Sequence, residues 1–336
     1  MKKLRLPTGR RAWNWVWKIA ATVIIGIVIG CSLTINSVTQ PASVTGGTVL
    51  PITLNATIVT NNPQTSALVI GVLVPTVWNA SANTTMTFTS SITSGPQPMT
   101  LIPAGTPSPN GGGVGWQTDL MNTIGHAGNL IPEYEWIAFQ SNTQYAVNSN
   151  TTVSVTVSIN ITVPTNNVYF KMAYVIAESS DGLHSTDYGD PSTDYYGTFF
   201  PAPIRVNGTG TLLDFVNPQL SVVVPGFSTD NDIITIPFNS TVAANPLSAA
   251  SSVYLCATGY TSAGDSIQVC QQTSKTQLQP LGAGNWQLDI WPRGFFGLSP
   301  GQSLDSIEYF FTDVNGANKV GYGAGTSPFS YTFGCQ

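Results

Sequence analysis

The chain has few residues of the kind that carry out enzyme chemistry. It contains only two histidines, His126 and His184, and no His-Glu-x-x-His, Gly-x-Ser-x-Gly or metal-type Cys/His pattern. Glu133 and Glu135 come closest to the carboxylate pair that glycoside hydrolysis needs, but two acids in the stretch Pro-Glu-Tyr-Glu-Trp are more typical of solvated loop charges. We therefore expect no enzyme and no catalytic residue, and a hydrolase stays as a third hypothesis.

An acidic loop is the one candidate for a metal site. Four of the sixteen acidic residues fall within 14 positions, namely Asp181, Asp187, Asp190 and Asp194. Calcium takes six to eight oxygen ligands, and a loop rich in Asp, Ser and Thr can supply them. The alternative is a solvated loop of Asx turns, because Asp and Gly favour turns in any case. No cofactor is expected apart from this possible structural calcium.

Exposed aromatic side chains are the candidates for sugar binding, which relies on a flat ring against the apolar face of a pyranose. Trp116 follows a glycine-rich run, and Trp291 precedes Pro-Arg-Gly at the end of an expected strand. Tyr195 and Tyr196 stand together at the end of the acidic loop. Trp286 lies within an alternating stretch and is expected in the core. With only 8% charged residues, the chain suits neutral glycans better than charged ones.

The beginning of the chain is typical of an export signal. Six of the eleven Lys and Arg residues lie in the first 18 positions, and a 12-residue apolar run follows, which is too short for a membrane span of about 20 residues. The run Val28-Ile-Gly-Cys31 resembles a bacterial lipobox, so we expect a signal peptide over 1–30 and lipidation of Cys31. A signal peptide cut elsewhere and an uncleaved anchor are the alternatives. Residues 31–45 are expected to form a linker or anchor segment.

The remaining charge excludes one class of partner. Beyond residue 30 the chain carries five basic and sixteen acidic residues, a net charge of −11. Proteins that bind nucleic acids neutralise phosphates with clusters of Lys and Arg. We therefore expect no nucleic-acid partner.

Two of the remaining cysteines are placed for a disulfide. The strand-like stretches around Cys256 and Cys270 flank a short turn, and if residues 262–264 form that turn, the two cysteines lie opposite each other. Opposed positions of an antiparallel pair have Cα atoms about 4.5–5.5 Å apart, which a disulfide can bridge. Export makes the bond chemically permissible. Cys335 then has no assigned partner: it is either free or competes with Cys256 or Cys270 for the disulfide bond.

The rest of the chain is expected to be all-β. Thr151–Val163 alternates strictly, with six β-branched apolar residues on one face, which indicates a half-buried strand. Only one short helix is expected, over 119–124. Many short strands without a long helical period favour antiparallel β-sandwiches of the Ig-like or carbohydrate-binding-module-like kind. The other expected strands are 49–59, 66–74, 84–90, 168–177, 220–224, 233–238, 286–290, 306–312 and 329–333.

Two β-sandwich domains are expected, an N-terminal one over 46–212 and a C-terminal one over 218–336. The boundary falls where Asn-Gly-Thr-Gly precedes a fresh start at Pro218. The interval 91–149 contains six prolines and a glycine run and is expected to form long loops.

Several stretches carry a resemblance to a known family. They are Leu68–Pro75, Trp78-Asn79 and Ser180–Leu183 in the first part and 227–236, Asn285–Leu288 and Ile307–Gly321 in the second. Through these stretches the chain resembles uncharacterised Bacteroidota outer-membrane lipoproteins of Sus-like polysaccharide-utilisation systems. The resemblance implies a domain of unknown function followed by an Ig-like or carbohydrate-binding-type β-sandwich. It also implies a place beside an outer-membrane transporter, as a glycan-binding accessory protein. The missing acidic residues after Cys31 leave open which side of the membrane the chain faces.

Two Asp-Ser-Ile tripeptides resemble the O-glycosylation acceptor of Bacteroidota, and they place candidate acceptors at Ser266 and Ser306.

Together these observations predict a non-catalytic, lipid-anchored glycan-binding protein of the outer membrane, on the cell surface, that takes part in polysaccharide uptake. Its expected partners are a neutral polysaccharide or oligosaccharide, the membrane and a transporter complex. The alternative is a structural or adhesive surface protein, a subunit of an extracellular assembly with no small-ligand site.

Overall fold

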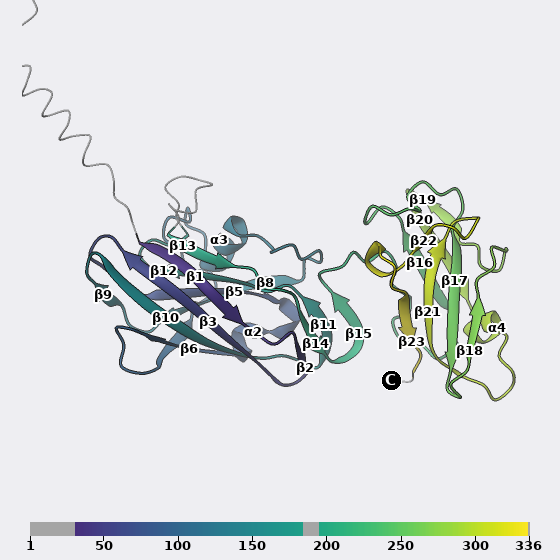
Figure 1. Cartoon of the computed structure of the whole chain (residues 1–336), viewed down its shortest axis with the longest axis horizontal. Helices are drawn as coiled ribbons and strands as arrows, with labels where there is room; N and C mark the ends of the chain where they lie inside the picture. Colours follow the sequence, from purple (N-terminus) through teal and green to yellow (C-terminus); the bar gives the residue numbers. More distant parts are fainter. Residues whose placement is uncertain (1–30, 184–194, 335–336) are drawn as a thin grey trace, which may run out of the picture. The chain divides into compact units, whose positions relative to one another are not determined.

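The computed structural model of the chain describes residues 31–183 and 195–334 and divides them into two units (Figure 1). Unit 1 comprises the described residues up to 127 together with 133–165 and 171–206, and unit 2 comprises 128–132, 166–170 and the residues from 207 on. Strands predominate in both units and most of their pairings are antiparallel, so the all-β prediction is confirmed. Within the described part, no helix is long and apolar enough to cross a membrane.

Unit 1 is built on nine strands that follow one another as hydrogen-bonded neighbours. In spatial order they are β1 (Ser32–Thr39), β3 (Val49–Thr60), β10 (Thr151–Thr162), β6 (Thr84–Ser90), β7 (Gln97–Leu101), β8 (Tyr134–Ser141), β5 (Leu68–Pro75), β12 (Ala173–Glu178) and β13 (Tyr196–Phe199). The two ends of this path meet, because Gly197 of β13 packs on the carbonyl of Leu33 in β1, where an added Cβ would stand 2.6 Å from the oxygen. The strands therefore enclose a common core.

The burial pattern of each strand explains its position in unit 1. In β10 the alternating residues from Val153 to Ile161 are all buried and their neighbours are mostly exposed, as the sequence predicted. Every residue of β5 and of β12 is buried, which requires cover on both faces. The helix α3 (Trp116–Thr123) supplies part of that cover, since Leu120 packs on the bare backbone of Gly71 in β5.

The smaller elements close the ends and edges. β4 (Gln64–Ser66) pairs with β9 (Tyr145–Val147), and β2 (Ser43–Thr45) is the neighbour of β14 (Ile204–Asn207). Two short helical turns, η2 (Thr76–Trp78) and α2 (Ala80–Asn83), connect β5 to β6.

Unit 2 contains two sheets around its own core. One sheet has the order β16-β20-β19, with β16 (Ile234–Asn239), β20 (Asn285–Ile290) and β19 (Gln279–Gly282). The other has the order β18-β17-β21-β22 with β23 also on β21, and its strands are β18 (Ser266–Val269), β17 (Tyr254–Thr261), β21 (Leu304–Thr312), β22 (Lys319–Val320) and β23 (Phe329–Thr332). β11 (Asn166–Phe170) and β15 (Thr209–Asp214) form a parallel pair, and α4 (Pro292–Phe296) and η3 (Tyr322–Ala324) complete the unit.

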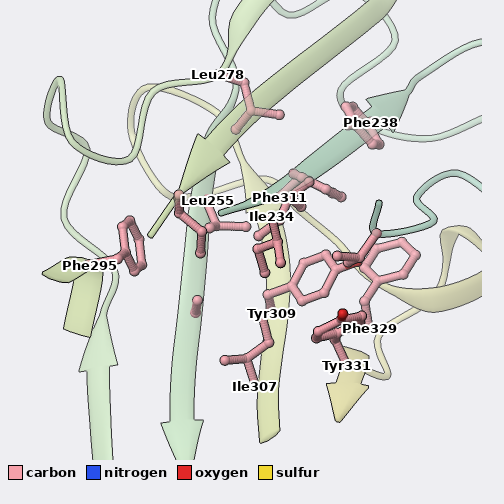
Figure 2. Packing of buried hydrophobic residues seen from close by; sticks show 14 of the residues in the cluster. Ile234, Phe238, Leu255, Leu278, Phe295, Ile307, Tyr309, Phe311, Phe329 and Tyr331 are labelled. Carbon is pink, nitrogen blue, oxygen red and sulfur yellow. The ribbon is translucent and has the colours of Figure 1, made fainter. Parts of the chain in front are cut away.

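Aromatic side chains fill the core between these two sheets (Figure 2). Phe238 of β16 stacks on Phe311 of β21 with ring centroids 4.4 Å apart, and Tyr309 stacks on Phe329 of β23 at 5.2 Å. Burying side chains of this size stabilises each by about 2–3 kcal/mol relative to exposure. The alternation of β16 sends Ile234, Ile236 and Phe238 inward, so the residues between them face outward.

Four expectations about the elements are wrong. The segment 31–45, expected as a linker or anchor, contains β1 and β2 instead, because Leu33 and Ile35 are buried in the core of unit 1. The interval 91–149, expected as loops around one short helix, also contains β7, β8 and β9; the expected helix itself is confirmed as α3, which begins at Trp116. The single strand expected over 168–177 is two strands, and 220–224 makes only an isolated bridge, from Val224 to Thr235.

Candidate functional site

Trp291 is the exposed aromatic around which a binding surface can be built. It directly follows β20, and half of its surface is accessible (50%). The register of β16 and β20, in which Ile234 pairs with Ile290, brings Ile233 opposite Trp291 on the outward face of the sheet. Ile233 is 68% exposed. The indole therefore lies on a sheet face that is turned away from the core of unit 2.

The position of the Trp291 ring is fixed by two contacts. Its Nε1–H donates a hydrogen bond of 3.2 Å to Oδ1 of Asn231. Its ring also packs on Gly294, where an added Cβ would stand 2.4 Å from ring carbon Cε3 and 2.8 Å from Cζ3. Such distances leave no room for any side chain at position 294. Ring carbons Cε3 and Cζ3 of the indole thus lie against the backbone at Gly294, and its N–H is held by the side-chain oxygen of Asn231.

The turn under the indole is itself braced by an ion pair. Arg293 Nη1 contacts Oδ2 of Asp230 at 2.9 Å, and the same carboxylate oxygen accepts the backbone N–H of Leu304 at 3.0 Å. The backbone N–H of Arg293 donates to the carbonyl of Asp230. Both partners of the ion pair are largely buried, so the interaction is less screened than a surface pair. This brace holds α4, and with it Gly294, beneath the ring.

Exposed apolar and polar side chains also lie on β16, on β20 and on the segment 222–224 that bridges to β16. Val222 and Val224 are both about half exposed, and Val224 bridges to Thr235 of β16. Beside them Thr235 Oγ1 donates a 2.6 Å hydrogen bond to Oδ1 of Asp289. The face thus offers one rigid aromatic ring, an aliphatic strip and an exposed carboxylate with a hydroxyl. Such a surface can stack a sugar ring and hydrogen-bond its hydroxyl groups.

The other aromatic candidates are placed differently. Trp116 is only 3% exposed and begins α3, so the prediction that it is presented on a loop for sugar binding is wrong: its indole belongs to the core of unit 1. Tyr195 and Tyr196 are half-buried at the start of β13 in unit 1. They therefore do not share a unit with Trp291. Trp286 packs partly buried against the core of unit 2, as expected.

The predicted calcium loop falls mostly outside the described residues. Asp187, Asp190 and Asp194 lie in the segment 184–194, which the structure does not describe. Asp181 is described, and its carboxylate accepts a hydrogen bond from Ser180 Oγ at 3.2 Å. Among residues 31–183 and 195–334 no three His, Cys, Asp or Glu side chains gather as a metal site would require. The calcium site stays a prediction.

Cys31 lies in an acidic environment at one end of unit 1. The residue is 3% exposed and its thiol is free. Burial, and then the carboxylates of Glu178 and Asp181, raise the pKa of the Cys31 thiol to about 12. The thiol is therefore protonated at neutral pH and a poor nucleophile in the folded chain. If Cys31 is acylated, the reaction must precede this packing.

The disulfide predicted from strand register is confirmed. Cys256 and Cys270 are bonded, with Cα atoms 4.1 Å apart. Ala257 pairs with Val269, and Tyr260 pairs with Ser266, which is the register that places the two cysteines opposite each other. Cys335 lies outside the described residues.

The two candidate glycosylation serines lie in one row of a sheet. Ser266 of β18 and Ser306 of β21 both pair with Tyr260 of the central strand β17. Ser266 is exposed and Ser306 is half-buried. Both positions belong to regular strands, and modification at either one stays a prediction.

Comparison with family models assigns most of the chain to two domains. Residues 33–219 match a family described as "Domain of unknown function (DUF4961)", and residues 221–320 match "Domain of unknown function (DUF8578)". The first match covers more than half of the chain. The chain belongs to the DUF4961 family. No curated protein matches this DUF4961 protein.

Solved structures that resemble the DUF4961 protein do so only distantly. AvmM, described as catalysing macrocyclization in alchivemycin A biosynthesis, is 11% identical with a TM-score of 0.26, covering 54% of this chain and 89% of that one. The C-terminal domain of the antigen I/II-family protein AspA of Streptococcus pyogenes is 8% identical with a TM-score of 0.24, covering 91% and 99%. The B domain of a biofilm-associated protein is 7% identical with a TM-score of 0.24, covering 90% and 84%. Likeness at this level carries no argument about function.

Sequence reasoning selected Trp291 but missed the residues that hold it. Gly294 and Asn231 gave no signal by themselves, because a glycine after Pro-Arg and an asparagine between two aspartates are both ordinary turn residues. Glu178 was also missed, although it ends a wholly apolar run, Ala-Tyr-Val-Ile-Ala, which is a signal that the carboxyl group is carried into a buried position.

Proposed function

We propose that this DUF4961 protein is a non-catalytic glycan-binding lipoprotein, held in the outer membrane through Cys31 and accessory to polysaccharide uptake at the cell surface. The observation that supports glycan binding best is the Trp291 ring, half exposed, with ring carbons Cε3 and Cζ3 against the backbone at Gly294 and its N–H bonded to Asn231. A ring already held in place loses little conformational entropy when a sugar stacks on it.

The ligand that suits this surface is a neutral polysaccharide or oligosaccharide. The basic group nearest in sequence to Trp291 is Arg293, and its guanidinium is engaged by Asp230. Asp289 is exposed beside Thr235 and would repel an anionic polymer at close range. Hydroxyl groups of a neutral sugar, in contrast, can donate to the Asp289 carboxylate.

The lipid anchor is supported by the sequence around Cys31 and by the strand that follows it. Because β1 begins at Ser32 and Leu33 is already buried, an anchor on Cys31 would be joined to the domain with no intervening linker. Mass spectrometry of the mature protein checks this part of the proposal. A diacylated Cys31 at the first position is expected, and Cys31→Ser should abolish the modification; an unmodified Cys31 on a secreted or cytosolic species would contradict it.

Affinity electrophoresis tests the glycan-binding part. The purified protein is run in native gels that contain single neutral polysaccharides, with Trp291→Ala beside it and Phe200→Ala as a matched exposed aromatic of unit 1. We expect at least one polymer to retard the parent and Phe200→Ala equally and to leave Trp291→Ala unretarded. Equal retardation of all three proteins, or no retardation by any polymer, would contradict the proposal.

A structural or adhesive role is the second candidate, and the aliphatic strip favours it. Val222, Val224 and Ile233 are 48–68% exposed on the same sheet face as Trp291, which is more apolar surface than a sugar site needs. If this face binds a protein subunit, the parent chain should co-purify in an assembly that Ile233→Asp disrupts, while no polysaccharide retards it.

A further inference from the structure

Unit 1 has a cavity between its strands that none of the sites above uses. Its accessible volume is about 50 Å³, and it opens partly to solvent. The walls are mostly apolar and come from strands β3, β6, β9 and β10: Ile58, Phe88, Tyr145, Val147, Val153 and Val155. Ile92, which is 45% exposed, also lines it. A space of this size accommodates a chain of a few methylene groups and not a sugar ring.

One wall of the cavity carries polar side chains. Glu178, the last residue of β12, is 5% exposed and lines the cavity together with Gln64 and Ser66. The Gln64 amide donates a hydrogen bond to Oε2 of Glu178. The Ser66 hydroxyl is hydrogen-bonded to the hydroxyl groups of Ser179 and Ser180. The carboxyl group of Glu178, hydrogen-bonded to Gln64, is thus the one carboxyl group among the residues that line the cavity.

Glu178 lacks a cationic partner within the described part of the chain. The ion pair found there joins Arg293 and Asp230 in unit 2. The titratable neighbours of Glu178 are the acidic Asp181 and the Cys31 thiol, and neither supplies a positive charge. An ionised carboxylate in an apolar setting without a counter-charge is costly, by several kcal/mol. Proteins retain such groups where a ligand supplies the missing charge or where the group has another function.

We propose that this cavity is a binding site for a primary ammonium group on a short unbranched alkyl stem, carried either by a free amine or by a lysine side chain. The ammonium donates hydrogen bonds to the Glu178 carboxylate, and the stem lies along Val153, Val155 and Phe88. The alkyl stem gains about 0.8 kcal/mol for each buried methylene group. A carboxylate ligand is excluded by Glu178 and Asp181, and a bulky amine is excluded by the size of the cavity.

Binding of n-butylammonium to the purified chain tests the proposal, with n-butanol and butyrate as probes of the same length. At about pH 8 we expect n-butylammonium to bind at least about tenfold more tightly than n-butanol, with NMR shifts of the Gln64 side-chain amide and of Tyr145, and butyrate not to bind. Glu178→Gln should reduce n-butylammonium to the level of n-butanol. Glu308→Gln, a half-buried glutamate of unit 2 that accepts a hydrogen bond from Tyr260, is the matched control and should leave both affinities unchanged.

A second variant keeps the test decisive if Glu178→Gln does not fold. Ile92→Trp narrows the mouth of the cavity and should weaken n-butylammonium and n-butanol alike. Equal affinities of the parent for n-butylammonium and n-butanol, a preference that survives in Glu178→Gln, or no shift with any probe would each overturn the proposal. Nα-acetyl-lysine methylamide and its norleucine counterpart distinguish the two sources of the ammonium group. If the lysine compound binds about tenfold more tightly than the norleucine compound, the site is assigned to a lysine side chain. If only n-butylammonium binds, the site is assigned to free amines.

Discussion

Trp291 and Gly294 are in direct contact: the indole lies where a side chain at position 294 would be, with ring carbon Cε3 only 2.4 Å from the place of an added Cβ. The glycine is therefore part of the proposed binding surface, although it has no side chain that could contact a ligand. Its missing side chain leaves room for the Trp291 ring beside α4.

Gly294→Ala should weaken glycan binding without removing the aromatic ring. The new methyl group forces the indole to rotate away from its hydrogen bond with Asn231, and we expect a loss of about 1.4 kcal/mol, or about tenfold in retardation constant. Affinity electrophoresis with the polymer that retards the parent gives the measurement.

Gly334→Ala is the matched control for this experiment, because nothing lies within 4 Å of an added Cβ there. It should bind like the parent. If Gly294→Ala binds like the parent as well, the fixed position of the ring does not matter for recognition.

The disulfide should stabilise unit 2 mainly by restricting its unfolded chain. It closes a loop of about 15 residues, for which chain entropy predicts roughly 3 kcal/mol. The double variant Cys256→Ser, Cys270→Ser should lower the free energy of unfolding by that amount, measured by urea denaturation. Reduction of the parent with dithiothreitol should produce the same decrease, and a decrease found only in the variant would point to lost packing instead.

Glu178 should make the stability of unit 1 depend on pH. Burial, with a smaller contribution from the nearby Asp181, raises the pKa of Glu178 from 4.5 to about 7 against the lowering effect of the Gln64 amide. Since the folded chain holds the proton more tightly than the unfolded chain, this contribution is fully present below about pH 4.5 and is lost as pH rises through about 7. We expect a loss of roughly 2–3 kcal/mol across that range.

Urea denaturation at several pH values, with Glu178→Gln beside the parent, measures this effect. The variant carries no titrating group at this position, so its stability relative to the parent should grow as pH rises from about 5 to about 8. Parallel pH profiles for the two proteins would show that Glu178 does not titrate in this range.

The Asp214 carboxylate should contribute strongly to the stability of unit 2. The residue is 1% exposed, and its Oδ1 accepts the backbone N–H groups of Val216 and Asn217 at 2.8 and 2.9 Å. Its Oδ2 accepts the Asn217 side-chain amide and the Tyr322 hydroxyl. Asp214→Ala leaves these donors without an acceptor and should lower the free energy of unfolding by about 3 kcal/mol.

Tyr322→Phe removes one donor only and should cost about 1 kcal/mol. Urea unfolding of unit 2, followed by its aromatic fluorescence, compares the two variants. Equal costs would mean that the Tyr322 hydroxyl accounts for the whole effect.

The amino-acid sequence by itself determined the fold class, most strand positions and the disulfide. Side chains alternate with period two in a strand, so the pattern of Thr151–Thr162 and of Ile234–Asn239 fixes which residues face inward before any partner is known. The Cys256–Cys270 bond also followed from local information, because a short turn sets the register of the strands it joins.

Only the tertiary structure decided where individual strands begin and end and which aromatic side chains are exposed. Ser32–Thr39 reads as a tether, yet it becomes a core strand because β3 offers it an edge and β13 packs against it. Trp116 directly follows a glycine and Trp291 precedes one by three residues, yet the first is buried and the second is half exposed. The exposure of a side chain and its close contacts depend on segments far away in the chain. Leu120 packs against Gly71 of β5, and Asn231 binds the indole N–H of Trp291, and no local sequence pattern predicts either contact.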